Sequence, residues 1–289
     1  MANPAAGRLY VVATPIGNLG DLSSRAREIL STCALIAAED TRHTGVLLKA
    51  FGIETPQLSL HDHNEQARTP ELVARLTQGA SIALVSDAGT PAISDPGFEL
   101  VRAAAAAGLD VIAIPGPCAA IAALSIAALP TDRFCFEGFL PARGAARRAR
   151  LESLAAEMRT LVFYESPHRV RDMLEDCAAM LGGERPAALA REITKLHETT
   201  YRGTLDGLAA QAASDPDLNR GEIVLTVAGA APAAVDATAG VDGHGGELDR
   251  VLKVLLAELP LKQAARLAAQ LTAARDNHAY KRALQLKQA

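Results

Sequence analysis

The sequence predicts an α/β protein built from two α/β domains, followed by a small helical appendage. Up to residue 130, short apolar runs alternate with Ala- and Leu-rich stretches of helical spacing, which is the order of a doubly wound sheet. These runs are continuously apolar, which is typical of parallel strands covered on both faces. After residue 130 there is more strand per helix, which predicts a mixed sheet.

The first domain, residues 1–130, is expected to alternate strands with helices. The predicted strands are 8–13, 35–38, 57–60, 82–86 and 111–114. The predicted helices are 22–30, 41–51, 64–78, 96–107 and 118–128. We expect Asp21 to cap the first helix. Glycines at 52, 79 and 108 suit the left-handed residue that ends a helix.

The second domain, residues 131–230, is expected to contain fewer helices. The predicted strands are 134–137, 161–164, 187–193 and 222–227, with a hairpin partner near 199–202. A basic loop is predicted over 143–150, followed by a helix that precedes the strand 161–164. Further helices are predicted over 167–181 and shortly before the last strand. Residues 231–246 are rich in Ala and Gly and show no period, which predicts a flexible linker. The appendage, 247–289, is predicted to form helices over 247–258, 261–271 and 276–286.

The composition limits the function classes. Hydrophobic residues make up 49% and charged residues 21%, enough apolar surface for a folded core. The net charge of −4 excludes nucleic-acid binding over the whole surface, so any RNA contact must use local basic patches. Aromatic residues make up only 3%, so the chain lacks the aromatic platforms on which single-stranded bases usually stack.

Neither a metal site nor export is indicated. The four cysteines show no C-x-x-C spacing and indicate reduced thiols of a cytosolic protein. No signal peptide and no apolar stretch of membrane-spanning length occurs, so we expect a cytoplasmic protein without a membrane partner. His61 and His63 lack an evident third ligand, so we expect loop packing or acceptor contact there and no metal.

Unusual residues follow six of the predicted strands. The segments are 14–18 (TPIGN), 39–42 (EDTR), 86–97 (SDAGTPAISDPG), 115–118 (PGPC), 165–169 (ESPHR) and 192–195 (EITK). Ligands bind beyond the carboxyl ends of parallel strands, glycine allows close approach, and Asp and Ser supply hydrogen bonds. Each segment alone is ordinary turn chemistry, but together they predict one shared site. Without G-x-G-x-x-G or a P-loop, a ligand lacking a pyrophosphate is favoured.

Six long segments resemble those of the ribosomal RNA small-subunit methyltransferase I family, of the tetrapyrrole-methylase-like superfamily. They are TPIGNLGDLSSRAREIL, AEDTRHTGVLL, SDAGTPAISDPG, IPGPCAAIAAL, FYESPHRV and REITKLHET, and the resemblance covers residues 8–229. It implies S-adenosylmethionine (S-adenosyl-L-methionine) as methyl donor and a cleft between two α/β domains. It also implies a homodimer and methylation of a cytidine ribose 2′-hydroxyl in the 16S rRNA of the small ribosomal subunit.

The resemblance also implies the residues that bind the donor. These are Pro15, Ser86, Asp87, Gly89, Thr90, Ala92, Ile93, Pro115, Gly116, Cys118, Ala119, Glu165 and Ser166. Cys118 stands where the family usually carries a small hydroxyl residue, so only backbone contacts are expected to persist there.

Methyl transfer to a ribose hydroxyl needs a base or a cation near the oxygen. Lys195 and Glu165 are the expected catalytic residues, with Lys195 placed between Glu165 and Glu192. Lys195 either stabilises a developing alkoxide or, if burial lowers its pKa, acts as base. The alternative is a structural ion pair. Other rim candidates are Glu39, Asp40 and Asp87.

Two basic segments are candidates for RNA contact. The first contains Arg143, Arg147, Arg148 and Arg150, which either bind phosphate or form a solvated helix start. The second, residues 262–289, carries six Lys and Arg against one Asp, and resembles a helix-turn-helix or a dimer-packing helix pair. Rival functions are methylation of a small tetrapyrrole-like molecule and a nucleotide-binding regulator without chemistry.

Overall fold

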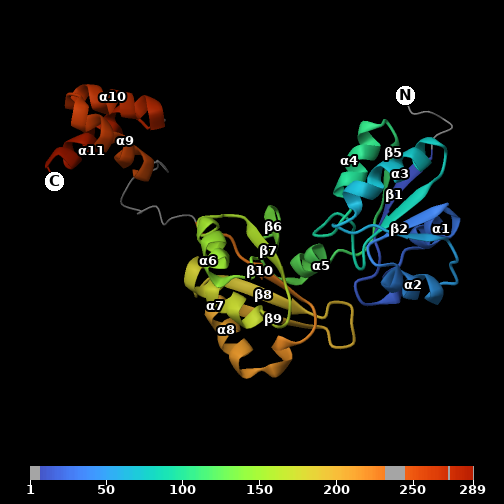
Figure 1. Cartoon of the computed structure of the whole chain (residues 1–289). Helices are drawn as coiled ribbons and strands as arrows, with labels where there is room; N and C mark the ends of the chain where they lie inside the picture. The colour runs from blue at the N-terminus through green and yellow to red at the C-terminus, as the bar shows by residue number, and fades with distance from the viewer. Residues whose placement is uncertain (1–6, 232–244, 273, 289) are drawn as a thin grey trace. The chain divides into compact units, whose positions relative to one another are not determined.

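A computed structural model describes residues 7–231, 245–272 and 274–288 of the chain. The chain divides into two compact units, residues 1–230 and 231–289 (Figure 1). The first unit contains two five-stranded sheets and the second unit is helical. The predicted linker, 231–246, lies almost entirely outside the described residues.

The first sheet is entirely parallel, with strand order β3-β2-β4-β1-β5. Its strands are β1 Arg8–Val12, β2 Leu35–Ala38, β3 Gln57–Ser59, β4 Ile82–Val85 and β5 Asp110–Ile114. The accompanying helices are α1 Ser24–Thr32, α2 Thr41–Ala50, α3 Glu65–Thr77 and α4 Phe98–Ala106, with a 3-10 turn over Leu19–Asp21. Apolar residues of α1 and α2 pack on one face of this sheet, and those of α3 and α4 on the other. The predicted doubly wound parallel sheet is confirmed.

The strand order places a switch point beside β1. Strand β1 lies between β4 and β5, so the chain winds toward β2 and β3 on one side and toward β5 on the other. In such sheets the loops that leave the strands on either side of this point separate and open a crevice. Here these loops follow β1 and β4, and an isolated bridge joins Thr14 to Gly89 across them.

The second sheet is mixed, as predicted, with strand order β6-β7-β10-β8-β9. Strands β6 and β7 are parallel, and the remaining pairs are antiparallel. The strands are β6 Phe134–Phe139, β7 Thr160–Glu165, β8 Pro186–Arg191, β9 Thr199–Thr204 and β10 Ile223–Val227. The helices are α5 Ala119–Ile126, α6 Gly144–Ser153, α7 Val170–Leu181 and α8 Leu205–Ser214, with a 3-10 turn over Pro216–Asn219.

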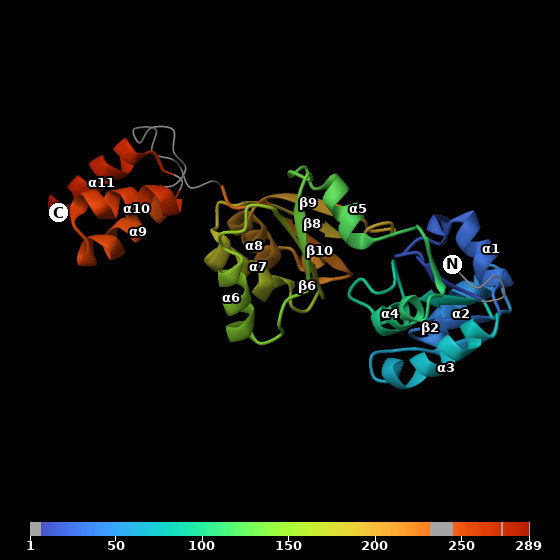
Figure 2. The ribbon, with the colours of Figure 1, turned by 90° about the horizontal axis from the view of Figure 1, so that it is seen from above.

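Helix α5 joins the two halves of the first unit. It precedes the predicted boundary at residue 130, yet Ala120, Ala123 and Leu124 pack against Val162 and Val224 of the second sheet. Helices α6, α7 and α8 cover the opposite face of that sheet (Figure 2). The boundary at residue 130 stays a prediction.

Two local predictions are wrong. Helix α1 is capped by Ser23, whose hydroxyl accepts a hydrogen bond from the Ala26 N–H at 3.1 Å, and not by Asp21, which lies in a separate 3-10 turn. Residues 144–153 form helix α6, so the predicted basic loop over 143–150 is helical from residue 144 and the helix expected after it begins earlier than predicted. The arginine side chains of this helix find acidic partners on neighbouring elements, and these partners are distant in sequence.

The second unit consists of α9 Gly245–Glu258, α10 Leu261–Thr272 and α11 Asp276–Gln288, close to the predicted helices. Its core contains Leu248, Leu252, Ala265, Ala268 and Ala279. Arg282 of α11 donates to the Asp249 carboxylate at 2.6 Å and ties α11 to α9. Among the described residues, no helix is both long and apolar enough to cross a bilayer.

Candidate functional site

A cavity of about 380 Å³ lies at the carboxyl ends of the strands of the first sheet. Residues of the second sheet line its other side. This volume falls within the range of small-molecule sites. All six strand-end segments predicted to share a site supply a lining residue. These lining residues are Ile16, Glu39, Asp87 to Thr90, Cys118, Glu165 to Pro167 and Ile193.

The loop after β4 lines one wall of the cavity, and its shape depends on unusual backbone conformations. Gly89 has φ +80°, a conformation that glycine adopts without strain, and exchanges backbone hydrogen bonds with Thr14 at 2.8 and 3.1 Å. Ala92 and Ser94 also have positive φ, at 66° each. Non-glycine residues in this region are strained, and such strain concentrates at ligand sites.

Three carboxylates converge on the first-half side of the cavity. The Asp87 N–H donates to Glu39 Oε2 at 3.3 Å, and the Asp40 N–H donates to Asp87 Oδ1 at 3.1 Å. Burial, followed by the negative charge of Asp87, raises the pKa of the Glu39 carboxyl. Burial, against a hydrogen bond with Ser86, raises the pKa of Asp95 to about 6, and the charges of Glu39 and Asp87 add to the effect. The cavity therefore favours a cationic ligand.

Asp40, the other acidic residue of segment 39–42, has a structural role. Its carboxylate accepts from the Arg42 N–H at 2.8 Å as the N-cap of α2 and pairs with the Arg42 guanidinium at 2.6 Å. Hydrogen bonds from Arg42 hold the pKa of Asp40 well below its ordinary value. Asp40 is therefore a poor candidate for a base.

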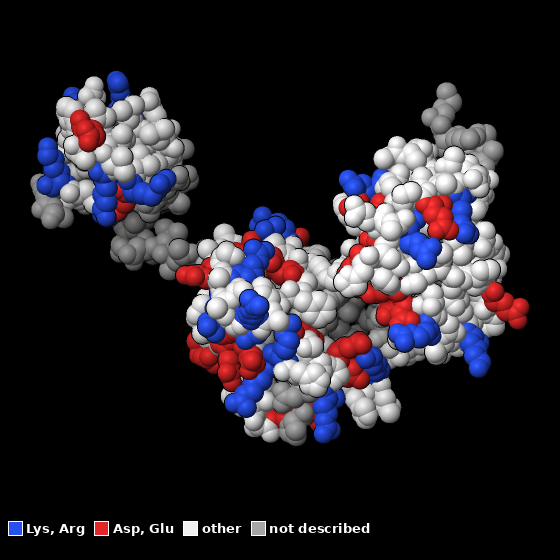
Figure 3. Space-filling model, viewed as in Figure 1, with Lys and Arg blue, Asp and Glu red and all other residues white. Residues whose placement is uncertain are grey.

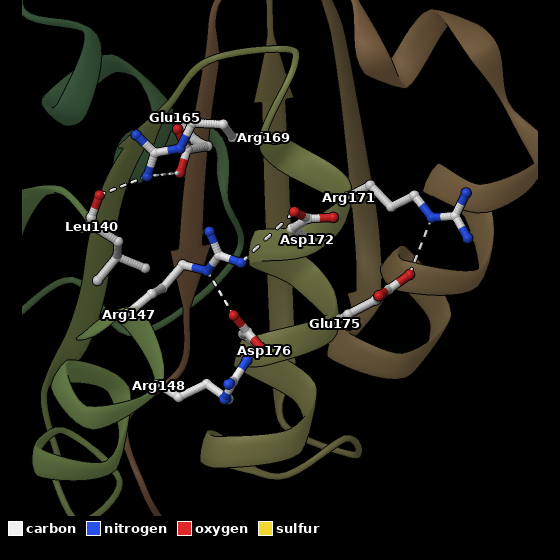
Figure 4. A network of polar contacts seen from close by, with 9 residues as sticks. All are labelled: Leu140, Arg147, Arg148, Glu165, Arg169, Arg171, Asp172, Glu175 and Asp176. Atoms are coloured by element: carbon white, nitrogen blue, oxygen red, sulfur yellow. Dashed lines mark hydrogen bonds and ion pairs between the residues drawn. The ribbon is translucent and has the colours of Figure 1, made fainter. Parts of the chain in front are cut away.

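Glu165 is buried in the second-half wall. Its Oε1 accepts from the Ser166 N–H at 2.8 Å, and its Oε2 lies 3.1 Å from the Arg169 guanidinium (Figure 4). Arg169 also donates to the Leu140 carbonyl at 2.6 Å. Burial raises the pKa of Glu165, while the Ser166 N–H and the Arg169 charge oppose the rise.

Lys195 pairs with Glu192, as predicted, but its second acidic partner is Glu222 and not Glu165. Its Nζ lies 2.9 Å from Glu192 Oε1 and 3.2 Å from Glu222 Oε2, whereas Glu165 pairs with Arg169. Lys195 does not line the cavity itself, but Glu222 does. Burial lowers the pKa of Lys195, but the hydrogen bond to Glu192 and the charge of Glu222 outweigh it, so the net pKa is raised. The residue therefore stays a cation at neutral pH.

Glycine makes the approach of this lysine possible. A Cβ on Gly17 would lie 2.4 Å from Lys195 Cγ, so a larger residue at position 17 would displace the Lys195 side chain from its present position. Glu192 and Thr194, which flank this approach, have φ of 53° and 70°. Four of the five non-glycine residues with positive φ in the described part of the chain therefore lie in loops beside the site; the fifth, Ala128, follows α5.

The arginines of helix α6 are engaged in ion pairs. Arg147 Nε donates to Asp176 Oδ2 at 2.6 Å, and its side chain is only 6% exposed (Figure 4). Arg148 reaches the same carboxylate at 3.3 Å, and Arg150 pairs with Glu137 at 2.6 Å. Arg143 is exposed at the N-cap. Arg147 therefore joins α6 to α7 and offers little charge to RNA.

The predicted donor-binding residues divide into two groups. Those that line the cavity are Asp87, Gly89, Thr90, Ile93, Cys118, Ala119, Glu165 and Ser166. Those that do not line it are Pro15, Ser86, Ala92, Pro115 and Gly116. Gly116 shapes the wall indirectly, because a Cβ there would lie 2.9 Å from the Ala13 Cβ.

Sequence reasoning missed several lining residues. Asp95, Phe139, Tyr164 and Glu222 all face the cavity. Asp95 lies within the predicted segment 86–97. The sequence separation between Asp87 and Asp95 gave no sign that the loop turns back toward the cavity. Tyr164 was predicted only as the last residue of the strand 161–164, with no role in the site. No group of three or more His, Cys, Asp or Glu residues with a metal-binding arrangement occurs in the described part of the chain.

Comparison with known proteins identifies the family. Residues 8–209 match the family model "Tetrapyrrole (Corrin/Porphyrin) Methylases", and residues 242–287 match "RsmI C-terminal HTH domain". The chain is 54% identical to a Pseudomonas aeruginosa protein named ribosomal RNA small subunit methyltransferase I, over 97% of this chain and 98% of that protein. A protein of the same name from Escherichia coli O157:H7 is 51% identical over 98% of this chain and 97% of that protein.

A solved structure shows the same fold. The uroporphyrin-III-C-methyltransferase from Thermus thermophilus superposes with a TM-score of 0.55 at 21% identity, covering 77% of this chain and 94% of that chain. The fold, the six-loop cavity and the full-length similarity agree. The chain belongs to the ribosomal RNA small subunit methyltransferase I family, a branch of the tetrapyrrole methylases.

Proposed function

We propose that the chain transfers the methyl group of S-adenosylmethionine to the 2′-hydroxyl of a cytidine ribose in the 16S rRNA of the small ribosomal subunit. Family membership supports the reaction type and the acceptor. We also propose that the protein works in the cytoplasm and as a homodimer, the state that the family resemblance implies.

The acidic wall of the cavity is the observation that carries the donor assignment. The negative charge of Asp87 contributes to the raised pKa of Glu39, and the charges of Glu39 and Asp87 contribute to the raised pKa of Asp95. S-adenosylmethionine carries positive charge on its sulfonium and its ammonium group. A cation of this kind offsets the repulsion between the carboxylates, and glycine at position 89 lets the ligand approach the backbone.

The proposed donor contacts follow from the lining of the cavity. Asp87, Gly89, Thr90, Cys118 and Ser166 contact the donor directly. Cys118 is the N-cap of α5 and makes no side-chain cap hydrogen bond, so its contribution comes from the backbone. The residues behind the lining (Pro15, Ser86, Ala92, Pro115 and Gly116) set the shape of the loops.

Lys195 and Glu165 have different proposed roles in the transfer. Methyl transfer is an in-line displacement, so the protein must align the acceptor oxygen with the methyl carbon and the leaving sulfur. Lys195 stays protonated and stabilises the negative charge that develops on the acceptor oxygen. Glu165, whose pKa is raised by burial, accepts the hydroxyl proton.

Contact with RNA is proposed for the exposed arginines of the α6 region. The side chains of Arg148 and Arg150 are 50% and 49% exposed, and Arg143 lies exposed at the helix start. On the face seen in Figure 3, basic and acidic side chains are interspersed over the first unit. This distribution suits a few phosphate contacts and not a continuous basic surface. The helical second unit is a second proposed RNA contact, consistent with the family model that it matches.

Labelled methyl transfer tests the proposal. The wild-type chain is incubated with tritiated S-adenosylmethionine and small ribosomal subunits that lack their own ribose methylation, and the modified nucleoside is identified by mass spectrometry. The proposal expects 2′-O-methylcytidine. Label in a tetrapyrrole acceptor but not in subunits would favour small-molecule methylation. Donor binding without transfer to either acceptor would favour a regulator without chemistry.

A further inference from the structure

Aromatic residues are scarce in this chain, yet three of them gather beside the cavity. The sequence contains six Phe, four Tyr and no Trp. Phe136 and Phe139 of β6 both pack edge-to-face on Tyr164 of β7, with ring centroids 4.9 and 5.6 Å away. Phe139 and Tyr164 line the cavity. An aromatic surface therefore exists at the place where the composition gave no reason to expect one.

A β-bulge creates this cluster. Phe136 pairs with Val162 and Gly138 with Phe163, so the register between β6 and β7 shifts by one residue at this point. Without the shift, residues three apart on a strand would point to opposite faces of the sheet. The bulge brings Phe139 to the face that carries Phe136 and Tyr164, and bulges beside active sites commonly redirect a side chain in this way.

Gly138 is required for the bulge. Its φ of +62° lies in the left-handed region, which glycine adopts at no steric cost. A Cβ at this position would also lie 3.1 Å from Ser94 Oγ of the first half. Glycine at position 138 therefore has two effects. It allows the bulge that places Phe139 on the same face as Tyr164, and it lets β6 pass close to the loop that carries Asp95.

Phe139 packs on Tyr164 and is otherwise largely exposed to solvent. Tyr164 is held in place because its hydroxyl accepts a hydrogen bond from the Ala120 N–H at 3.1 Å. Phe139 rests on this fixed ring and remains 56% exposed. Strand β6 is also an edge strand of its sheet, so no further strand covers this side. The Phe139 ring thus offers a flat apolar surface at the border between cavity and solvent.

We propose that Phe139 is the platform on which the base of the acceptor nucleotide stacks. This inference rests on the proposed function and names how that site recognises its substrate. Sequence-specific recognition of RNA commonly targets unstacked bases of single-stranded segments, which then stack on aromatic side chains of the protein. The carboxylates that suit the donor cation are on the first-half loops, which leaves Phe139 of the second half for the acceptor.

The neighbouring charges fit the same ligand. Glu137, the residue that the bulge bypasses, pairs with Arg150 at 2.6 Å and ties helix α6 to this edge strand. The half-exposed Arg150 guanidinium of α6 therefore lies beside the strand that carries Phe139, where it can contact a phosphate of the stacked nucleotide.

Steady-state kinetics with small ribosomal subunits and calorimetry with S-adenosylmethionine test the inference. Phe139→Ala should lower kcat/KM for subunits about 5- to 150-fold, because stacking on an aromatic ring is worth about 1–3 kcal/mol per base. Donor affinity should stay within about twofold of wild type, which also shows that the variant folds. Phe139→Tyr should retain most of the activity, whereas Phe139→Leu, which keeps apolar bulk without a stacking face, should resemble Phe139→Ala.

Phe98→Ala is the matched control, since Phe98 is 63% exposed at the start of α4 and does not line the cavity. Three results would overturn the inference: unchanged kcat/KM in Phe139→Ala, a loss of donor affinity equal to the loss in kcat/KM, or a change in the mass of the protein in solution. The second result would assign the ring to the donor, and the third to a contact between copies. Absence of transfer by the wild-type chain would instead remove the proposed function itself.

Discussion

Donor affinity should fall about tenfold when the pH is lowered from 7 to 5, because Asp95 takes up a proton in that interval. Burial sets the pKa of Asp95 at about 6 in the free protein. With that value about 90% of the carboxyl is ionised at pH 7 and about 10% at pH 5. If only the ionised form attracts the donor cation, the affinity follows these fractions. Glu39, whose pKa is also raised, acts in the same direction.

Asp95→Asn separates this effect from a general loss of fold. Calorimetric titration with S-adenosylmethionine at pH 5, 6 and 7 should give about tenfold weaker binding than wild type at pH 7 and nearly equal binding at pH 5. Wild-type binding near pH 6 should also release protons, visible as a dependence of the heat on the ionisation enthalpy of the buffer. A wild-type affinity that is constant from pH 5 to 7 would refute the placement of the donor beside Asp95.

The same carboxyl affects stability with a definite sign. Because its folded pKa of about 6 exceeds the ordinary value of 3.8, the folded protein binds this proton more tightly than the unfolded chain. The stability that results is fully present below pH 3.8 and is lost as the pH rises through 6. A difference of this size corresponds to at most about 3 kcal/mol, which partial exposure reduces to about 1–2 kcal/mol. Asp95→Asn should therefore be more stable than wild type at pH 8.

The remaining predictions concern the transfer, the donor loops and the ion pairs of α6. Lys195→Ala should leave donor affinity unchanged by calorimetry and lower kcat at least tenfold, and normal turnover would make Lys195 purely structural. Asp87→Ala should abolish measurable donor binding because it removes a carboxylate, and Gly116→Leu should do so because it forces the loop after β5 away from β1. Unchanged affinity in both variants would refute the placement of the donor site. Arg147→Ala should lower the free energy of unfolding by about 3 kcal/mol because it leaves a carboxylate without its buried partner, whereas the exposed Arg148→Ala should cost less than about 1 kcal/mol in the same denaturation assay.

Much of the fold could be predicted from apolar patterning. Continuous apolar runs marked the strands of the parallel sheet because both of its faces are covered by helices. The strand order could not be predicted, since it depends on which runs pair across the sheet. Helix α5 is similar, because nothing in its Ala-rich sequence distinguishes one sheet from the other, and the structure places it on the second.

The site was predicted at the level of loops but not of pairings. Strand ends of a parallel sheet meet at one edge, and this rule located the six segments. It could not give the partners of Lys195 and Glu165, which depend on lateral distances between loops. The partners of Arg147 had a usable signal, because Asp172 and Asp176 are four residues apart and so share one face of α7. The platform at Phe139 had none, since a one-residue bulge determines where it points.

The most direct measurement is a crystal structure of the chain soaked with S-adenosylhomocysteine, the product left after methyl transfer. The account predicts that the ligand lies in the cavity between the two sheets, with its positively charged amino group toward Glu39, Asp87 or Asp95 and its backbone contacts at Gly89 and Cys118. It also predicts that the Phe139 ring stays free for the acceptor. Ligand density at any other site, with this cavity empty, would contradict the account.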